Sequence, residues 1–315
     1  MEKTLEIKFE HTPVLLNECL DGLNIDPTCI YVDGTLGGGG HSGEILKRLT
    51  TGKLIAFDKD DDALTSTKAK LSGFGDKVIF VKSDFKDMFA RVKDLGYDKV
   101  NGILLDLGVS SYQIDTADRG FSYRFDGKLD MRMDRSASLT ARDVVNTYSK
   151  EDLQRILYNY GEESFAKLIV NKILEARETK EIETTGELTS LVESAIPKKF
   201  WGKGSVAKKT FQAIRIEVNG ELEGLDRAIN QMIDLLAPNG RLCIITFHSL
   251  EDRIVKNVFK ERCTDCICDK SLPFCVCNHK ADAELVNRKP IVAGEEELKY
   301  NKRSSSAKLR VLQKK

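Results

Sequence analysis

Four consecutive glycines and three aspartates are the residues of this 315-residue chain whose types and spacing could hold a cofactor. The glycines occupy residues 37–40, and Asp33, Asp58 and Asp106 each close a short apolar run. A glycine-rich turn between a strand and a helix lets the backbone approach a ligand and points the first N–H groups of the helix at it. Ligands of open parallel sheets bind at the carboxyl ends of the strands. We therefore expect one cofactor site at these positions.

The residues around the glycine run distinguish between cofactors. The run lacks the Gly-Lys-Ser/Thr of a nucleoside-triphosphate loop, although Gly38, Gly40 and Gly43 match the dinucleotide pattern G-x-G-x-x-G. Carboxylates repel a pyrophosphate, whereas S-adenosylmethionine carries a sulfonium cation and no phosphate. Asp58 can accept hydrogen bonds from ribose, and Phe85 can pack on adenine. The pattern resembles class I S-adenosylmethionine-dependent methyltransferases, and an NAD-dependent oxidoreductase is the enzyme alternative.

A cysteine cluster near the C-terminus could bind a metal ion. It consists of two C-x-C pairs, and four thiolates can bind zinc tetrahedrally. The four predicted ligands are Cys266, Cys268, Cys275 and Cys277, with Cys263 and His279 flanking them. A flexible reduced loop and a pair of disulfides remain open alternatives. We expect a structural role for this cluster.

A basic stretch with aromatic residues is a candidate contact for RNA. No acidic residue occurs between residues 197 and 216, and Phe200 and Trp201 lie next to lysines. The basic side chains are Lys198, Lys199, Lys203, Lys208, Lys209 and Arg215. Such a stretch can bind phosphates and stack a base, and a solvated lysine-rich loop is the alternative.

Periodicity predicts the elements that position these residues. Apolar runs at 29–32, 54–57, 78–81 and 100–105 alternate with helical patterns at 44–49, 62–71 and 88–95, which indicates a parallel sheet with helices between its strands. Beyond Asp106 the pattern is helical, with helices expected within 149–177 and at 188–196. The α/β pattern then resumes. Its elements are a helix at 222–236, a turn at 237–240, a strand at 241–247, a helix at 251–260 and strands at 290–293 and 307–312.

These patterns predict an α/β fold, a Rossmann-like methyltransferase domain with an inserted α-helical domain. We expect the first part of the methyltransferase domain at 1–112 and the second part at 210–315, with a cysteine-rich loop at 263–279. The helical insertion between them, at 113–209, is the expected RNA-recognition domain.

Composition narrows the class of protein. The chain has 49 basic and 49 acidic residues, which argues against a protein that coats nucleic acid by electrostatic attraction alone. No apolar run approaches the 18 or so residues that cross a bilayer, and residues 1–6 lack the pattern of an export leader. Cys19, Cys29 and Cys243 are isolated in apolar surroundings, which favours a reducing cytoplasm.

Seven ordered motifs together resemble one family. They are residues 11–16 (HTPVLL), 33–42 (DGTLGGGGHS), 103–111 (ILLDLGVSS), 119–122 (RGFS), 129–134 (LDMRMD), 210–216 (TFQAIRI) and 247–253 (FHSLEDR). The chain is similar in these motifs to the ribosomal RNA small subunit methyltransferase H family, also called MraW. The resemblance implies methylation of N4 of a cytosine in the decoding region of bacterial 16S rRNA within the small ribosomal subunit. The cofactor contacts it implies are Gly39, Gly40, His41, Asp58, Phe85, Asp106 and Gln113.

The chain departs from many amino-methylating enzymes in one respect. Those enzymes carry Asn/Asp-Pro-Pro-aromatic after the fourth strand, whereas residues 106–109 here read DLGV. The stacking aromatic must come from elsewhere, with Phe121, Tyr123 and Phe125 as candidates. We expect Asp106 to polarise the amine and His248 to accept a proton or anchor the base. A non-catalytic RNA-binding assembly protein is the alternative outside enzymes.

Overall fold

The computed structural model describes residues 13–202, 204–269 and 272–315. The chain divides into two compact units. An α/β unit contains the residues up to Gly108 and Gly224–Lys315, and a helical unit contains Val109–Glu223. Each unit has its own hydrophobic core. His11, Thr12 and Lys203, which belong to the motifs predicted above, lie outside the described residues.

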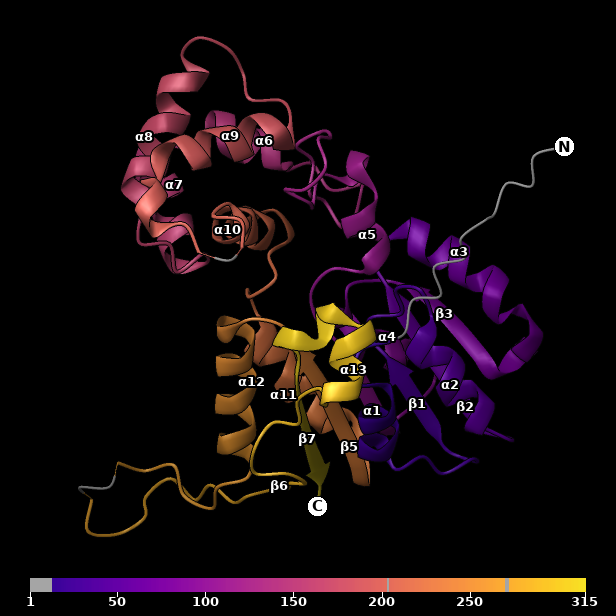
Figure 1. Cartoon of the computed structure of the whole chain (residues 1–315). Helices are drawn as coiled ribbons and strands as arrows, with labels where there is room; N and C mark the ends of the chain where they lie inside the picture. Colours follow the sequence, from indigo (N-terminus) through magenta and orange to yellow (C-terminus); the bar gives the residue numbers. More distant parts are fainter. Residues whose placement is uncertain (1–12, 203, 270–271) are drawn as a thin grey trace, which may run out of the picture. The chain divides into compact units, whose positions relative to one another are not determined.

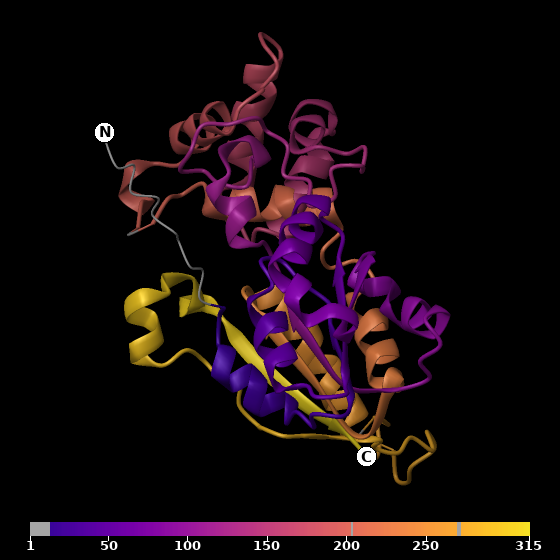
Figure 2. The same cartoon turned by 90° about the vertical axis from the view of Figure 1, so that its right-hand side faces the viewer.

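The α/β unit is built on a seven-stranded sheet in the order β3-β2-β1-β4-β5-β7-β6 (Figure 1). Its parallel strands are β1 (Ile30–Asp33), β2 (Lys53–Asp58), β3 (Val78–Lys82), β4 (Val100–Asp106) and β5 (Leu236–Thr246). β7 (Lys308–Lys314), the long yellow strand of Figure 2, pairs antiparallel with β5, and β6 (Ala283–Leu285) pairs antiparallel with β7. The strand order reverses between β1 and β4, so a ligand crevice is expected beside the carboxyl ends of these strands.

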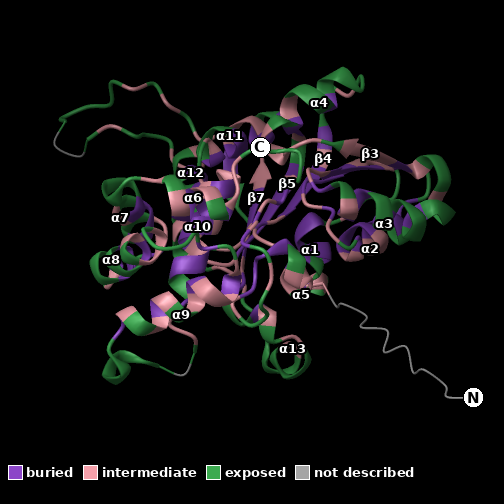
Figure 3. Ribbon diagram, turned by 90° about the horizontal axis from the view of Figure 1, so that it is seen from above, coloured by how far each residue is buried: buried purple, intermediate pink, exposed green. Residues whose placement is uncertain are grey.

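Helices cover both faces of the sheet, and Figure 3 shows buried strands between partly exposed helices. Successive residues of β4 point to opposite faces of the sheet. Ile103 and Leu105 pack in the core on one face, and Leu104 packs in the core on the other. One face carries α4 (Met88–Asp94), α11 (Leu225–Leu235) and α12 (Ser249–Arg262), and the other carries α1 (Leu16–Leu23), α2 (Gly40–Arg48) and α3 (Asp61–Leu71). The short helix α13 (Glu295–Tyr300) precedes β7. Among the described helices, none is both long and apolar enough to span a bilayer.

The helical unit contains six α-helices among the described residues, and the last five of them contribute residues to its core. The six are α5 (Ser111–Asp115), α6 (Ala141–Thr147), α7 (Lys150–Asn159), α8 (Ala166–Arg177), α9 (Thr185–Ala195) and α10 (Lys208–Asn219). Capping boxes begin α5, α6 and α9, each with a Ser or Thr N-cap. α10 lies in this unit because Phe211, Ala213 and Ile214 are buried in its core. The unit therefore extends to Glu223, whereas the helical insertion was expected to end at residue 209.

The α/β architecture with a helical insertion is confirmed, and two expected elements are wrong in detail. Residues 290–293 form no strand, since only Ile291 pairs, through an isolated bridge to Leu309. The helices expected within 149–177 are α7 and α8, and Glu162 adopts a positive φ of 47° between them. The expected turn at 237–240 lies within β5, where Asn239 has a φ of 66° and the register with β4 shifts.

Candidate active site

The glycine run forms the turn between β1 and α2. Gly39 is the N-cap of α2 with a φ of 74°, a conformation that favours glycine. A Cβ atom on Gly39 would lie 2.4 Å from Thr67 Cγ2, and one on Gly40 would lie 2.3 Å from Pro13 Cγ. A Cβ on Gly38 would meet no atom within 4 Å. Packing therefore requires glycine at 39 and 40, whereas the space beside Gly38 is open to a ligand.

Hydrogen bonds fix the ends of β1 and β4 to this turn. Ser42 Oγ donates to Asp33 Oδ2 at 2.6 Å, and the Thr35 N–H donates to Asp33 Oδ1 at 3.1 Å. The Asp106 N–H donates to Thr35 Oγ1 at 2.6 Å. Burial raises the pKa of Asp33. Sequence reasoning did not single out Thr35 and Ser42; their signal was a hydroxyl on each side of the glycine run.

Asp58, at the end of β2, has the geometry expected of a ribose ligand. Its Oδ2 accepts the Gly37 N–H at 2.8 Å, and its Oδ1 accepts the Asp60 N–H at 2.9 Å. Burial raises the pKa of Asp58 to about 6, against the opposing effect of these two hydrogen bonds. Because a carboxylate oxygen has two lone pairs, each oxygen can still accept a hydroxyl hydrogen bond.

Phe85 follows β3 at the same edge of the sheet. It is half-buried, packs against the core, and its Cβ would lie 3.3 Å from a Cβ on Gly34. The preceding Asp84 caps this turn by accepting the Lys86 N–H at 3.0 Å, and Lys59 Nζ lies 3.3 Å from Asp84 Oδ2. The Phe85 side chain therefore begins beside Gly34, at the start of the turn between β1 and α2.

Asp106 and His41 face each other between β4 and α2. His41 is buried, and its Nε2 lies 3.0 Å from the Val14 carbonyl oxygen, which requires a proton on Nε2. Its Nδ1 lies 3.9 Å from Asp106 Oδ2. Burial raises the pKa of Asp106 to about 6, and His41 opposes that shift. Among the described residues, Asp106 Oδ1 has no hydrogen-bond partner, so this buried acceptor is open to a donor from outside the chain.

His248 begins α12 and is engaged by Glu251. Its Nδ1 accepts the Glu251 N–H at 3.5 Å, and its Nε2 lies 3.1 Å from Glu251 Oε1. Glu251 is itself buried, and its Oε2 accepts the Phe247 N–H at 2.9 Å. The Nδ1 contact caps the start of α12, whereas Nε2 is a buried nitrogen without a hydrogen-bond partner among the described residues.

The remaining predicted residues lie in the helical unit. Gln113 is buried in α5, where its Oε1 accepts the Ser110 N–H at 3.0 Å as part of a capping box. Of the three aromatic candidates, Phe121 is buried and Tyr123 packs edge-on against Phe211 at 5.8 Å, so both contribute to the core. Phe125 is 48% exposed and is the one of the three that can stack on a base.

The basic stretch presents aromatic side chains to solvent. Phe200 and Trp201 are 55% and 41% exposed, and the Lys199 ammonium lies 5.1 Å from the centre of the Phe200 ring. The Trp201 indole N–H donates to the Ile196 carbonyl at 3.0 Å, which fixes the ring. A rigid exposed indole among lysines suits stacking with a base near a phosphate.

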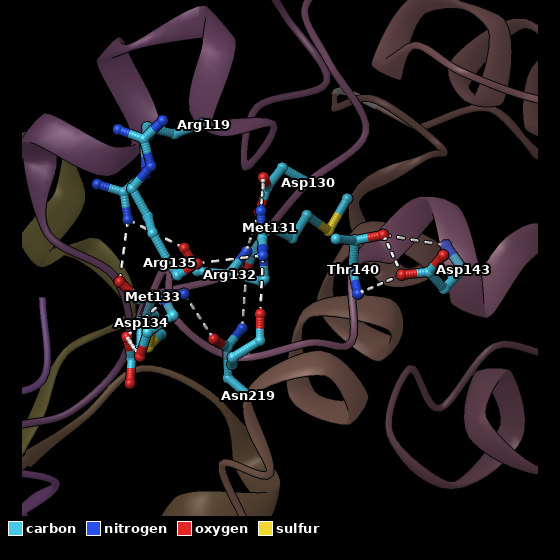
Figure 4. Close-up of polar contacts among 12 residues, drawn as sticks. Arg119, Asp130, Met131, Arg132, Met133, Asp134, Arg135, Thr140, Asp143 and Asn219 are labelled. Atoms are coloured by element: carbon cyan, nitrogen blue, oxygen red, sulfur yellow. Dashed lines mark hydrogen bonds and ion pairs between the residues drawn. The ribbon is translucent and has the colours of Figure 1, made fainter.

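The LDMRMD motif is a loop held by buried polar contacts (Figure 4). Asn219 Nδ2 donates to the Met131 carbonyl at 2.8 Å, and its Oδ1 accepts the Met133 N–H at 2.7 Å. Arg119 Nη2 donates to the carbonyls of Arg132 and Met133. Met131 is fully buried with a φ of 60°, a strained conformation for methionine. The motif thus builds a rigid loop within the helical unit.

We predict that Asn219→Ala destabilises the helical unit by about 1–3 kcal/mol, because it leaves two backbone groups of this loop without partners. Asn171→Ala, at an exposed position of α8, is the matched control. Urea unfolding followed by limited proteolysis measures both variants. Equal stability of the two variants would show that Asn219 does not hold the loop.

The four predicted zinc ligands come together in the structure. The Sγ atoms of Cys266, Cys268, Cys275 and Cys277 all lie within 4.8 Å of one another. The cluster belongs to the loop between α12 and β6. The cluster shares no residue with the predicted cofactor site at the carboxyl ends of the strands.

Comparison with known proteins identifies the family. The model of the MraW methylase family matches residues 8–315. A ribosomal RNA small subunit methyltransferase H from Finegoldia magna is 56% identical over 310 residues, covering 98% of this chain and 99% of the relative. The protein of that name from Clostridioides difficile is 51% identical over 310 residues, with 98% and 100% covered.

Two solved structures are similar at low sequence identity. An rRNA methylase from Streptococcus thermophilus has a TM-score of 0.41 and 13% identity, covering 96% of this chain and 98% of that one. A methyltransferase from Streptococcus mutans in complex with SAH has a TM-score of 0.42 and 14% identity, with 97% and 100% covered. Both scores are low, so the assignment depends on the match in sequence. On that match, which spans nearly all of its length, the chain belongs to the MraW methylase family.

Proposed function

We propose that this protein transfers a methyl group from S-adenosylmethionine to N4 of a cytosine in the decoding region of bacterial 16S rRNA. The family supports methyl transfer, and its relatives are named for the RNA of the small ribosomal subunit. The observation that carries the proposal is Asp106, a carboxylate at the end of β4 whose buried Oδ1 has no partner among the described residues. Such an acceptor suits an amine that must lose a proton.

The residues at the sheet edge fit S-adenosylmethionine. Asp58 can hold the ribose, Phe85 can pack on adenine, and the open side of Gly38 leaves room beside the turn. The buried carboxylates Asp33 and Asp106 add negative charge, which favours a cation and disfavours the pyrophosphate of NAD. When bound, the cofactor supplies an electrophilic methyl group on a sulfonium.

Asp106 performs two tasks in this mechanism. The lone pair of a cytosine amine is delocalised into the ring, so the nitrogen is a poor nucleophile until a hydrogen bond draws it toward tetrahedral geometry. The Asp106 carboxylate accepts that hydrogen bond at Oδ1 and then takes the proton that the nitrogen loses after methylation. Holding the base in line with the methyl group supplies much of the rate. The base must leave its stack, so the target is single-stranded, bulged or flipped.

The other proposed contacts are assigned to residues of both units. The backbone of Gly39 and Gly40 and the ring of His41 form the cofactor turn, and Gln113 orders the segment that follows β4. Because Asp106 takes the proton, the role that we assign to His248 is to anchor the base through its unpartnered Nε2. Exposed Phe125 and Trp201, with the lysines near Trp201, bind the RNA around the target. The partner is the small ribosomal subunit, and the site of action is the cytoplasm.

We predict that kcat/KM rises with pH from about 5 to 7 with an inflection near 6, because the reaction needs the ionised form of Asp106, whose pKa in the free protein is raised to about 6. The pH dependence of stability has the opposite sign. Burial of Asp58 and Asp106 favours their protonated forms, so the free energy of unfolding falls as pH rises from near 4 through about 6. Steady-state kinetics and urea unfolding over this pH range measure the two effects. A value of kcat/KM that is flat across the range would contradict the role of Asp106.

Cofactor choice provides the test of the proposed chemistry. We expect S-adenosylmethionine and its demethylated product to raise the melting temperature of the purified protein, and NAD to leave it unchanged. Protection by NAD alone would favour the oxidoreductase. Tight binding of small subunits without any methyl transfer would favour an RNA-binding assembly protein.

A further inference from the structure

The loop between α12 and β6 is closed at its base, and its described residues between 264 and 281 form no hydrophobic core. The Asp282 N–H donates to the Arg262 carbonyl at 3.2 Å, and Arg262 Nε donates to Asp282 Oδ1 at 2.8 Å. The apolar side chains within the loop are instead exposed, with Phe274 73% and Val276 62% accessible. Burial of apolar surface therefore cannot hold this loop in one conformation, and another cross-link is needed.

The four cysteine sulfurs have the spacing of a tetrahedral metal site. Cys275 Sγ lies 3.6 Å from Cys277 Sγ, which lies 3.9 Å from Cys266 Sγ. Four sulfurs at about 2.3 Å from a zinc ion are separated by about 3.8 Å in tetrahedral geometry. The observed separations bracket this value, so one ion at the centre of the cluster would reach the sulfurs without a large rearrangement of the loop.

Backbone N–H groups are directed at the sulfurs. The Val276 N–H donates to Cys268 Sγ at 3.3 Å. The backbone N–H groups of Ile267 and His279 donate to Cys277 Sγ. Donors of this kind stabilise thiolate charge and orient metal ligands.

Neighbouring residues that could compete as ligands are engaged elsewhere. Cys263 packs against the hydrophobic core of the α/β unit. The Nε2 atom of His279 lies 3.0 Å from the Glu261 carbonyl oxygen at the end of α12. The structure thus brings together the four cysteines that were predicted as ligands and leaves Cys263 and His279 outside the cluster.

We propose that Cys266, Cys268, Cys275 and Cys277 bind one Zn²⁺ ion as four thiolates and that this ion stabilises the loop. Binding exchanges four thiol protons for the metal ion, and a site with four protein ligands has no open position for a substrate. The ion is structural, and this proposal does not depend on the proposed methyl transfer. Thiolate ligands favour zinc over magnesium or calcium.

Metal analysis of the full-length protein tests the site. Protein purified under reducing conditions without chelators should contain about one zinc ion per chain. The double variant Cys266→Ser/Cys275→Ser should lose nearly all of it, whereas Cys263→Ser and His279→Gln should keep it. Substitution by Co²⁺ should give the visible absorption of a tetrahedral cobalt–thiolate site, and chelation should speed proteolysis of the loop.

Four results would overturn the proposal. They are metal-free protein with all four thiols reduced, disulfides between these cysteines, iron in place of zinc, and zinc retained by the double variant. A double variant that loses zinc and still transfers methyl groups would support a purely structural ion. Because metal content and methyl transfer are measured separately, failure of one proposal is distinguishable from failure of the other.

Discussion

The Asp106→Asn variant is expected to lose about 100-fold or more in kcat at saturating cofactor. Asparagine keeps the size of the side chain and an oxygen that can accept the amine N–H, but it has no negative charge and cannot take the proton. The carboxylate lies at the end of β4, where Thr35 Oγ1 holds its backbone N–H at 2.6 Å. The loss should therefore come from chemistry, with the backbone in place.

Kinetics separate this role from cofactor binding. Replacing a residue that only binds the cofactor would raise the KM for S-adenosylmethionine and leave kcat unchanged. We expect kcat to fall by more than the affinity for S-adenosylmethionine, and the pH dependence near 6 to disappear. Asp94→Asn, at an exposed position of α4, is the matched control and should keep full activity. Full turnover by Asp106→Asn would leave the proposed mechanism without its acceptor.

Neighbouring glycines of the cofactor turn are expected to respond differently to the same substitution. Gly39→Ala places a Cβ 2.4 Å from Thr67 Cγ2 at a φ of 74°. Thr67 is buried, and its Oγ1 donates to the Gly37 carbonyl at 2.8 Å, so it cannot rotate away without losing that bond. The cost should be about 2–4 kcal/mol from the left-handed conformation and the overpacking together.

Gly38→Ala is compared with Gly39→Ala, because it adds the same methyl group at a position without steric conflict. Its Cβ meets no protein atom within 4 Å, so the free energy of unfolding should change little. If the cofactor occupies the space beside Gly38, the added methyl group should weaken S-adenosylmethionine binding. Urea unfolding and calorimetric titration of both variants measure the two effects. Unchanged affinity in Gly38→Ala would place the cofactor on another side of the turn.

The first half of the sheet was predictable because its signals are local. Runs of apolar residues ended by Asp33, Asp58 and Asp106 gave β1, β2 and β4 to within one or two residues. Later elements depend on pairing over long distances. Residues 290–293 are as apolar as a strand, yet β7 pairs with β6 at Ala283–Leu285 and takes only Ile291 from the predicted segment.

The site was predictable in its residue types but not in its geometry. The spacing predicted that the aspartates lie at one edge of the sheet. It could not show that Thr35, after β1, accepts the backbone N–H of Asp106 at the end of β4. It could not show that His248 caps α12 through Nδ1 and leaves Nε2 buried without a hydrogen-bond partner among the described residues. The four cysteine ligands were predicted, but their spacing did not show how closely the four sulfurs lie. Such geometry depends on contacts between residues that are far apart in the chain.

The most direct test is nucleoside analysis after methyl transfer. Purified protein is incubated with methyl-labelled S-adenosylmethionine and small ribosomal subunits from cells that lack the activity, and the RNA is digested to nucleosides. The proposed function predicts label in N4-methylcytidine from the decoding region. Label in any other nucleoside, or no label while the cofactor still binds, would contradict it.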